Sequence, residues 1–412
     1  MERSVTVLGA GIVGICTALS LAERGVRVRV IDRSDPGQET SFGNAGVISP
    51  WSIIPQSLPG TWRQIPQLMW GRYRPLSVRL QTWPAMIPRG LRFLRRGTEQ
   101  KVREAADAME HLCGPGIELY RRHLEGTGGE NLVADSMYVH AFRDGSRASL
   151  RSLDYAIRSE KGAELELIGQ DELRRTEPAL HPEFQAAVLV KGQARALSPG
   201  HIGTVLADKA RRLGVTFVRD SIQRLEAKDG GWQVVCDGQT FECPDVVVAM
   251  GAWSAALLDP LGLKMPLMAE RGYHVEFPQP GITLNNSVMD VDAKFVASSM
   301  EDGLRVAGQA EFGPVDAPPA PRRKDQLVRQ ARQTFPDIDL SAPRFWMGRR
   351  PSFPDSLPAL GGVKGRQGLY LNFGHSHYGL MMAPRSGELV SDLVTGRMPN
   401  ANFPQISPER FA

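Results

Sequence analysis

Residues 5–32 read VTVLGAGIVGICTALSLAERGVRVRVID, and this stretch decides the fold. The β-branched run at residues 5–8 is typical of a buried parallel strand. A GxGxxG pattern then opens a run of apolar residues at helical spacing, which Gly25 ends. A second apolar run follows and stops at Asp32. The stretch therefore predicts a strand–turn–helix–strand unit, the start of a Rossmann-type sheet.

The three glycines of this pattern predict a dinucleotide site. Gly9 permits a tight turn, Gly11 lets the backbone approach a pyrophosphate, and Gly14 lets helix and strand pack closely. The helix N-terminus offers unpaired N–H groups to phosphates. Asp32 can hold ribose hydroxyls and disfavours a 2′-phosphate. The pattern leaves NAD and FAD both open.

Residues 4–22 carry no charge, so a signal sequence or a transmembrane helix has to be considered. The strand-like start, the glycine punctuation and the lack of a small-residue cleavage site after a basic region argue against both. No other segment is long and apolar enough to span a bilayer. We therefore expect a chain that is cytoplasmic, either free or peripheral on the inner face of the cytoplasmic membrane.

The composition indicates an ordinary globular enzyme. The 412 residues are 42% hydrophobic and 23% charged, which suits one large or two medium domains. The cysteines form no CxxC pair and have no histidines at zinc-like spacing, so we expect free thiols in a reducing compartment and no metal site. They are Cys16, Cys113, Cys236 and Cys243.

Charge is distributed unevenly along the chain. Residues 40–98 contain no Asp or Glu and eight arginines, which leaves the rest of the protein at −4 within a net charge of +4. This indicates one basic face and excludes a general nucleic-acid binder. Residues 51–97, the basic segment, also hold four of the seven tryptophans, which suits either a membrane interface or packing in a domain or dimer contact. The residues are Arg63, Arg72, Arg74, Arg79, Arg89, Arg92, Arg95, Arg96, Trp51, Trp62, Trp70 and Trp83.

A second stretch, ETSFGNAG at residues 39–46, follows Asp32 closely. Its small and polar side chains would let backbone and hydroxyl groups pack against a cofactor passing over them. The alternative is a plain surface loop, which the lack of any charge after Glu39 disfavours.

Four motifs carry a family resemblance. They lie at residues 7–33, at residues 39–50 (ETSFGNAGVISP), at residues 246–258 (VVVAMGAWSAALL) and in the C-terminal region from GRRPSFPDSLPALGG to LYLNFGHSHYGLMMAPRSGELVSDLVTG, residues 348–396. In order and spacing the chain resembles the FAD-dependent D-amino acid oxidase superfamily, most closely its D-amino acid dehydrogenase branch (DadA-like, small subunit). The resemblance covers essentially the whole chain.

The resemblance implies an α/β fold with two interleaved domains. A Rossmann-type FAD-binding domain would comprise residues 1–50, 145–265 and 345–412. An α+β substrate domain on a mostly antiparallel sheet would comprise residues 51–144 and 266–344, including the basic segment.

The resemblance also implies FAD as the cofactor and a set of contacts to it. The helix at about residues 383–394 would aim its N-terminus at the flavin pyrimidine oxygen. Ile222 would place backbone groups at the adenine. The expected FAD contacts are Gly9, Ala10, Gly11, Ile12, Val13, Gly14, Asp32, Arg33, Thr40, Ser41, Asn44, Ala45, Gly46, Ile222, Gly251, Trp253, Gly374, His375, Gly379, Leu380 and Met381.

An amino acid substrate needs an anchor for its carboxylate, and arginine binds carboxylates with a planar fork. In the family pattern the residue before the proline of GRRP has this role, which implies Arg350. Arg349 is expected to form a surface ion pair. Tyr273 fits the pattern of a second carboxylate contact, with a buried core aromatic as the equal alternative. His274 should point to the opposite face of the same strand.

The C-terminal glycine loop supplies further candidates. His375 and His377 face the cavity region in the family pattern, and His375 is expected to contact substrate or flavin. Imidazole titrates in the range needed to deprotonate an ammonium group. Ser376 stands where glycine is usual, and with the bulky Tyr378 it indicates a reshaped pocket.

The resemblance implies oxidation of a D-amino acid, or of a cyclic imino acid such as D-proline or hydroxy-D-proline, by hydride transfer to flavin N5. Electrons would pass to a quinone or another acceptor. The alternatives are a glycine or N-methyl amino acid oxidase using oxygen, and a non-catalytic FAD-binding subunit of an electron-transfer complex with partner subunits.

Overall fold

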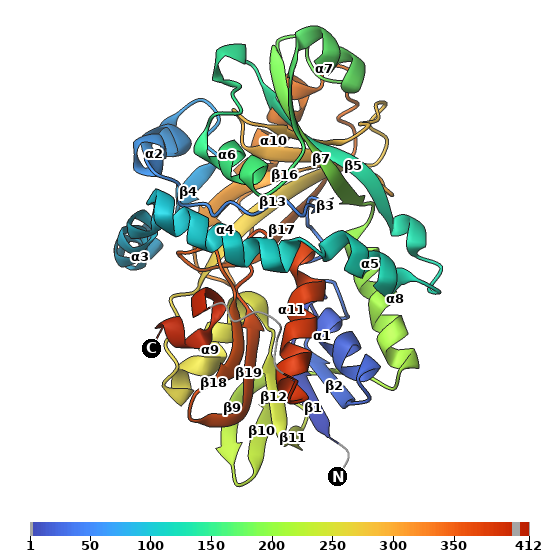
Figure 1. Cartoon of the computed structure of the whole chain (residues 1–412), viewed down its shortest axis with the longest axis vertical. Coiled ribbons are helices and arrows are strands. Elements are labelled where there is room, and N and C mark those ends of the chain that lie inside the picture. Colours follow the sequence, from blue (N-terminus) through green and yellow to red (C-terminus); the bar gives the residue numbers. More distant parts are fainter. Residues whose placement is uncertain (1–2, 398–403, 412) are drawn as a thin grey trace.

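The computed structural model describes residues 3–397 and 404–411. Two parts are stacked along its long axis, and each is built on one large sheet (Figure 1). Both ends of the chain lie in the lower part, and helices α4 (Glu99–Cys113) and α5 (Gly116–Leu124) lie where the two parts meet.

The lower part contains a six-stranded sheet in the order β18-β19-β12-β1-β2-β8. All neighbouring pairs are parallel except β18 and β19, which form an antiparallel pair at one edge. This is the Rossmann-type arrangement that the N-terminal glycine pattern predicts. The strands are β1 (Ser4–Leu8), β2 (Arg27–Asp32), β8 (Thr216–Arg219), β12 (Asp245–Val248), β18 (Ala359–Val363) and β19 (Arg366–Phe373).

Both faces of this sheet are covered, which explains why residues 5–8 of β1 are all buried. Val5 and Val7 pack with the helix layer, whereas Leu8 packs with a small three-stranded sheet on the other face. The helix layer consists of α1 (Ile12–Glu23), α8 (Pro199–Arg212) and α11 (Gly379–Val394). The small sheet consists of β9 (Ile222–Lys228), β10 (Gly231–Cys236) and β11 (Thr240–Cys243), with α9 (Ser254–Leu258) beside it.

The upper part contains a ten-stranded, mostly antiparallel sheet whose core order is β17-β13-β16-β15-β14-β5-β7-β3. Helix α10 (Arg322–Thr334) packs on β13 and β16. The strands are β3 (Val47–Ile48), β4 (Leu76–Val78), β5 (Val133–Phe142), β6 (Leu165–Gly169), β7 (Ala186–Ala196), β13 (Met268–Phe277), β14 (Ser287–Asp290), β15 (Phe295–Met300), β16 (Gly303–Phe312) and β17 (Arg344–Ser352), with α6 (Leu153–Glu160) and α7 (Gln170–Thr176) beside them.

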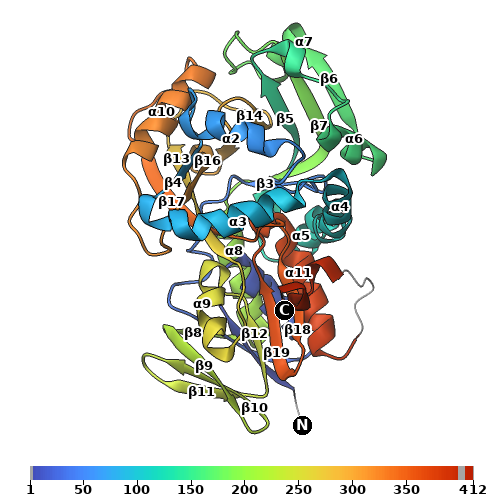
Figure 2. The same cartoon turned by 90° about the vertical axis from the view of Figure 1, so that its left-hand side faces the viewer.

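The basic segment forms two helices on one side of the molecule, α2 (Thr61–Trp70) and α3 (Trp83–Arg96), with β4 between them. Figure 2 looks onto this side and shows α3 crossing the joint between the two parts. No residue of α2 is buried, and Arg89 is the buried residue of α3. No helix within the described residues is long and apolar enough to cross a bilayer.

Most element predictions are confirmed, with differences at boundaries. Residues 103–123 have helical periodicity, which alone predicts one helix, but the chain turns at Gly114 and Pro115 and forms α4 and α5 instead. Helix α11 begins at Gly379 and not near residue 383. By pairing, β6, β7 and β17 belong to the ten-stranded sheet, although they fall in the ranges 145–265 and 345–412 that we assigned to the nucleotide domain. Sequence alone does not reveal which sheet these strands join, because sheet membership depends on pairing with distant strands.

Candidate functional site

A cavity of about 1130 Å³ lies where the two parts meet. It is larger than the roughly 300–1,000 Å³ of a typical small-molecule pocket. The loop after β1, the stretch at residues 39–47 and the loop before α11 line it from below. Residues of β13, β16 and β17, of α2 and α3, and of the segment after β12 also line it.

The loop after β1 has the geometry of a phosphate cradle. Gly9 has a φ of +107°, and a Cβ there would lie 2.5 Å from the Ala249 carbonyl oxygen. A Cβ on Gly14 would lie 1.9 Å from the carbonyl oxygen of Gly9, so helix and loop could not pack as closely. Ile12 N–H, at the start of α1, donates to Ser41 Oγ at 2.9 Å. The first turn of α1 has no acidic residue, and its N-cap residue Gly11 has no side chain to cap it, so apart from Ile12 N–H this helix end remains open to an anion.

Asp32 closes the other end of this cradle. Its carboxylate accepts hydrogen bonds from Ala10 N–H at 2.7 Å and Ser34 N–H at 2.8 Å. Burial raises the pKa of Asp32, and these two backbone hydrogen bonds oppose the rise. The side chain is thus held in one orientation at the cavity wall, where its remaining lone pairs can accept from hydroxyl groups.

Most of the predicted cofactor residues line this cavity, and three do not: Ala10, Gly14 and Gly46. Ala10 orients Asp32 through its N–H, and Gly14 serves helix packing. Gly46 joins the loop to the upper sheet, because its carbonyl accepts from Ala196 N–H at 2.7 Å. These three residues therefore support the cavity wall from behind.

One rim of the cavity carries two arginines on a tryptophan ring. The guanidinium carbons of Arg33 and Arg349 lie 4.1 Å and 5.4 Å from the ring centre of Trp253. Arg349 Nη1 also lies 4.0 Å from Glu39 Oε2, and its backbone exchanges hydrogen bonds with Thr40 Oγ1. Arg349 is therefore in an ion pair at the rim, as predicted.

Arg350 lies on the cavity side of β17, directly over Gly272, where a Cβ would come within 2.2 Å of its Cζ. Its Nη1 donates to Glu270 Oε1 at 3.0 Å and to the Gln309 carbonyl at 2.8 Å. Both contacts use Nη1, and Nη2 has no partner among the described residues. One edge of the guanidinium is therefore free for a ligand.

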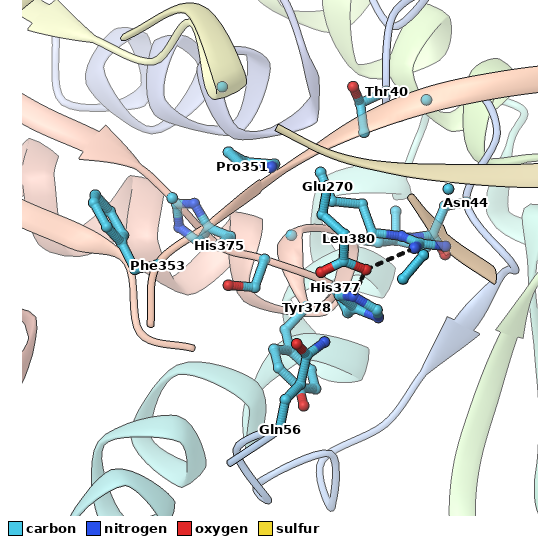
Figure 3. Close-up of a pocket in the computed structure, with 18 of the residues that line it drawn as sticks. Thr40, Asn44, Gln56, Glu270, Pro351, Phe353, His375, His377, Tyr378 and Leu380 are labelled. Atoms are coloured by element: carbon cyan, nitrogen blue, oxygen red, sulfur yellow. Dashed lines mark hydrogen bonds and ion pairs between the residues drawn. The ribbon is translucent and has the colours of Figure 1, made fainter. Parts of the chain in front are cut away.

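Glu270 is the centre of a charged cluster (Figure 3). Besides Arg350, it accepts from Ser352 Oγ at 3.2 Å and contacts His377 Nε2 at 2.5 Å. Its side chain is 3% exposed, and burial alone would raise its pKa. The charges and hydrogen bonds of His377 and Arg350 outweigh burial and lower the pKa of Glu270 to about 2. Glu270 thus stays ionised and fixes both neighbours.

His375 differs from His377 in having no hydrogen-bonding partner for either ring nitrogen among the described residues. It is 1% exposed, lines the cavity and lies near Pro351 and Phe353 (Figure 3). Burial lowers its pKa to about 3, so the imidazole is neutral at physiological pH. It is therefore a weak base for an ammonium group and a ready hydrogen-bonding partner for a ligand.

The C-terminal loop has the strain that its sequence indicates. Ser376 has a φ of +51°, in the left-handed region where glycine is favoured, and its buried Oγ has no partner in the described chain. Tyr378 is partly buried and donates to the Ile54 carbonyl at 2.7 Å. The loop leads directly into α11, whose N-terminus with Leu380 and Met381 lines the cavity.

Tyr273 needs a correction, because its side chain points away from Arg350. In the register of β13 and β17, Glu270 pairs with Arg350 and Tyr273 with Met347, so the tyrosine lies on the opposite face. Its hydroxyl donates to Glu311 at 3.0 Å, and its ring stacks on Phe345 in the core. The buried-aromatic alternative therefore describes Tyr273. His274 does lie on the other face, where it stacks on Trp346.

Sequence reasoning missed three polar residues of the cavity. Glu270 could have been found, because a charge inside a buried strand requires partners. Gln309 has a φ of +63°, and its buried amide has no partner among the described residues. Arg89 reaches in from α3 to the carbonyls of Pro266 and Ser352, and burial lowers its pKa to about 10. No pattern in the sequence marks Gln309 or separates Arg89 from its exposed neighbours.

The residues that line the cavity fit a flavin dinucleotide. The glycine cradle suits a pyrophosphate, Asp32 suits a ribose, and the neutral His375 beside the N-terminus of α11 suits an uncharged ring system. Within residues 3–397 and 404–411, no group of three or more His, Cys, Asp or Glu is placed to hold a metal ion.

Comparison with solved structures finds the same fold. Glycine oxidase from Geobacillus kaustophilus superposes with a TM-score of 0.75 at 21% identity, over 98% of both chains. L-proline dehydrogenase from P. horikoshii also gives a TM-score of 0.75 at 21% identity, over 100% of this chain and 98% of that one.

Sequence comparison gives closer relatives. A D-amino-acid oxidase from Bradyrhizobium diazoefficiens is 34% identical over 418 residues, or 99% of each chain. A D-amino acid dehydrogenase from Rhizobium rhizogenes is 30% identical over 426 residues, again 99% of each chain. The profile of the DAO family, described as FAD dependent oxidoreductase, matches residues 4–393. The chain is therefore a member of the DAO family of FAD-dependent oxidoreductases.

Proposed function

We propose that this protein oxidises D-amino acids to imino acids, with Arg350 as the anchor for the substrate carboxylate. The observation that carries the proposal is a partly buried guanidinium with one free edge, at the wall of a cavity that also contains a dinucleotide cradle. The D configuration is supported by the relatives named D-amino-acid oxidase and D-amino acid dehydrogenase.

The charges around Arg350 favour one more anion. Glu270 supplies one negative charge, and it faces positive charge from Arg350, Arg89 and His377. A substrate carboxylate would reduce this positive excess, and it would pair with the free edge of Arg350. Glu270 then acts as a positioning residue, because it holds the guanidinium in place without touching the substrate.

FAD, when bound, would supply the two-electron acceptor for a hydride from the substrate α-carbon. The protein residues orient the substrate and exclude water. His375 is neutral and has both ring nitrogens free, so it donates or accepts a hydrogen bond and does not remove a proton at neutral pH. The substrate amine therefore has to react in its neutral form.

The substrate range and the electron acceptor form the finer part of the proposal. We include cyclic substrates such as D-proline and hydroxy-D-proline, and a quinone or similar acceptor in preference to oxygen. One relative is named a dehydrogenase, which supports an acceptor other than oxygen. Another is named an oxidase, so oxygen as the acceptor is the competing outcome. We also propose peripheral contact with the membrane and the presence of partner subunits.

Anaerobic mixing of the FAD-loaded protein with amino acids tests the proposal. D-Alanine, D-proline and hydroxy-D-proline should bleach the flavin absorbance, and the matched L enantiomers should not. Bleaching by glycine or sarcosine alone would indicate a different substrate class. No bleaching by any amine would favour a non-catalytic subunit. Oxygen consumption measured beside quinone reduction then identifies the acceptor.

A further inference from the structure

The outward faces of α2 and α3 carry most of the exposed large apolar side chains in the described chain. On α3, Trp83, Ile87, Leu91 and Leu94 are spaced four, four and three residues apart, so they share one face of the helix. Ile87 is 62% exposed and Leu91 is 54% exposed. These side chains form a continuous apolar stripe in contact with solvent.

Helix α2 repeats this pattern. Trp62 and Trp70, eight residues apart, lie on one face of the helix and are 57% and 65% exposed. Residues Ile65 and Leu68 lie on the other face and line the cavity. The two helices lie on the same side of the molecule (Figure 2). We call the outward faces of α2 and α3 the α2–α3 surface.

The charges on this surface are all positive. Arg63, Arg92, Arg95 and Arg96 are exposed on the two helices, and the sequence has no acidic residue between Thr40 and Thr98. Arg89 is not part of this surface, because its side chain is buried and bonded to backbone carbonyls. Exposed tryptophans and leucines flanked by arginines match a lipid surface with anionic headgroups.

We propose that the α2–α3 surface docks the protein on an anionic lipid bilayer as a peripheral membrane protein. A second copy of the chain fits this surface poorly. A two-fold dimer would place the same arginine-rich patch against itself, with no carboxylate from the segment to balance it. The inference does not depend on the identity of the substrate. It places the cavity beside the bilayer, because Leu94 belongs to both the stripe and the cavity lining.

Vesicle flotation with the FAD-loaded protein tests this proposal. Vesicles of phosphatidylcholine mixed with phosphatidylglycerol should carry the protein, and vesicles of phosphatidylcholine alone should carry much less. High salt should release it, because the Debye length falls to about 3 Å at 1 M. Failure to bind the anionic vesicles at low salt would overturn the proposal.

Variants separate the two contributions. Replacing Arg92, Arg95 and Arg96 by Gln should weaken vesicle affinity on the order of a hundredfold, at about fivefold for each arginine. Replacing Trp62, Trp70, Ile87 and Leu91 by Ser should remove the salt-resistant part of binding. Both variants should reduce a soluble dye as fast as the parent. Matched controls on other surfaces are Leu167→Ser with Leu213→Ser, and Arg174→Gln with Arg175→Gln.

Two results would contradict the proposal. One is unchanged vesicle binding by both test variants. The other is a dimer that sedimentation velocity detects without lipid and that dissociates in the serine variant. In that case the apolar stripe would be a protein interface.

Discussion

Removing Arg350 should have two separable effects, because the side chain holds Glu270 and is proposed to hold the substrate. In Arg350→Leu, the substrate loses charge-assisted hydrogen bonds worth about 1.5–3 kcal/mol each. For two such bonds, kcat/KM should fall on the order of a hundredfold or more. The same change leaves a buried carboxylate with His377 as its remaining charged partner, which costs stability as well.

The double variant Arg350→Leu with Glu270→Gln separates these effects. Breaking a buried ion pair from one side costs about 3–5 kcal/mol, whereas removing both charges costs much less. The double variant should therefore regain most of the stability that Arg350→Leu loses and should still fail to bind substrate well. Arg344→Leu is the matched control, because Arg344 lies on the same strand with its side chain 63% exposed and outside the cavity lining.

The assay is anaerobic flavin bleaching, with the rate and apparent affinity measured for D-alanine and for its amide. The amide lacks the carboxylate, so its rate should differ little between the parent and the double variant. In the double variant, D-alanine should no longer reduce the flavin faster or bind more tightly than its amide. If the double variant holds FAD and reduces it with D-alanine as the parent does, Arg350 is not the anchor and the proposed function fails with it.

Denaturation against pH gives an independent check on the cluster. The pKa of Glu270 is lowered from 4.5 to about 2 in the folded state. Its contribution of about 3 kcal/mol is therefore fully present above pH 4.5 and is lost as pH falls toward 2. Glu270→Gln should be less stable than the parent at neutral pH, and the difference should close over this window. A constant difference would contradict the assigned ion pairs.

Three further outcomes follow from single positions. Gly14→Ala should lower both the melting temperature and FAD retention, measured by flavin release on heating, because its Cβ would lie 1.9 Å from the Gly9 carbonyl oxygen. Burial raises the pKa of Glu177 to about 7, so the parent must bury a charge as pH rises from 4.5 through 7. Chemical denaturation should therefore show Glu177→Gln gaining stability relative to the parent over this window, by up to about 3 kcal/mol. His375→Asn should slow flavin reduction without changing the shape of its pH profile over about pH 5 to 8, where a free histidine titrates, because His375 is already neutral there.

The nucleotide half of the site could be predicted because its determinants are local. The glycine pattern, the helix and Asp32 all lie within residues 5–32, and each has one physical reason to be where it is. The C-terminal loop was predicted from family resemblance, and the left-handed backbone of Ser376 shows why glycine is usual there.

The substrate half could not be predicted with the same certainty, because it depends on strand register. In β13, residues 269–277 are all buried, so no alternation of polar and apolar residues shows which side chains share a face. Both faces carry ion pairs, Glu270 with Arg350 on one and Arg271 with Glu311 on the other. Each partner comes from a strand far along the chain.

The two alternatives for Tyr273, a carboxylate contact and a buried core aromatic, could not be separated from sequence because of this symmetry. The family pattern offered a tyrosine and an arginine, and it is the pairing of β13 with β17 that decides whether they meet. The same pairing brings Glu270 under Arg350 and so gives the guanidinium one occupied and one free edge. Strand β13, whose facing residues sequence could not assign, is thus the strand that positions Arg350, the proposed anchor. The proposed substrate contact thus depends on strand register, whereas the predicted cofactor contacts of the N-terminal motif depend on local sequence.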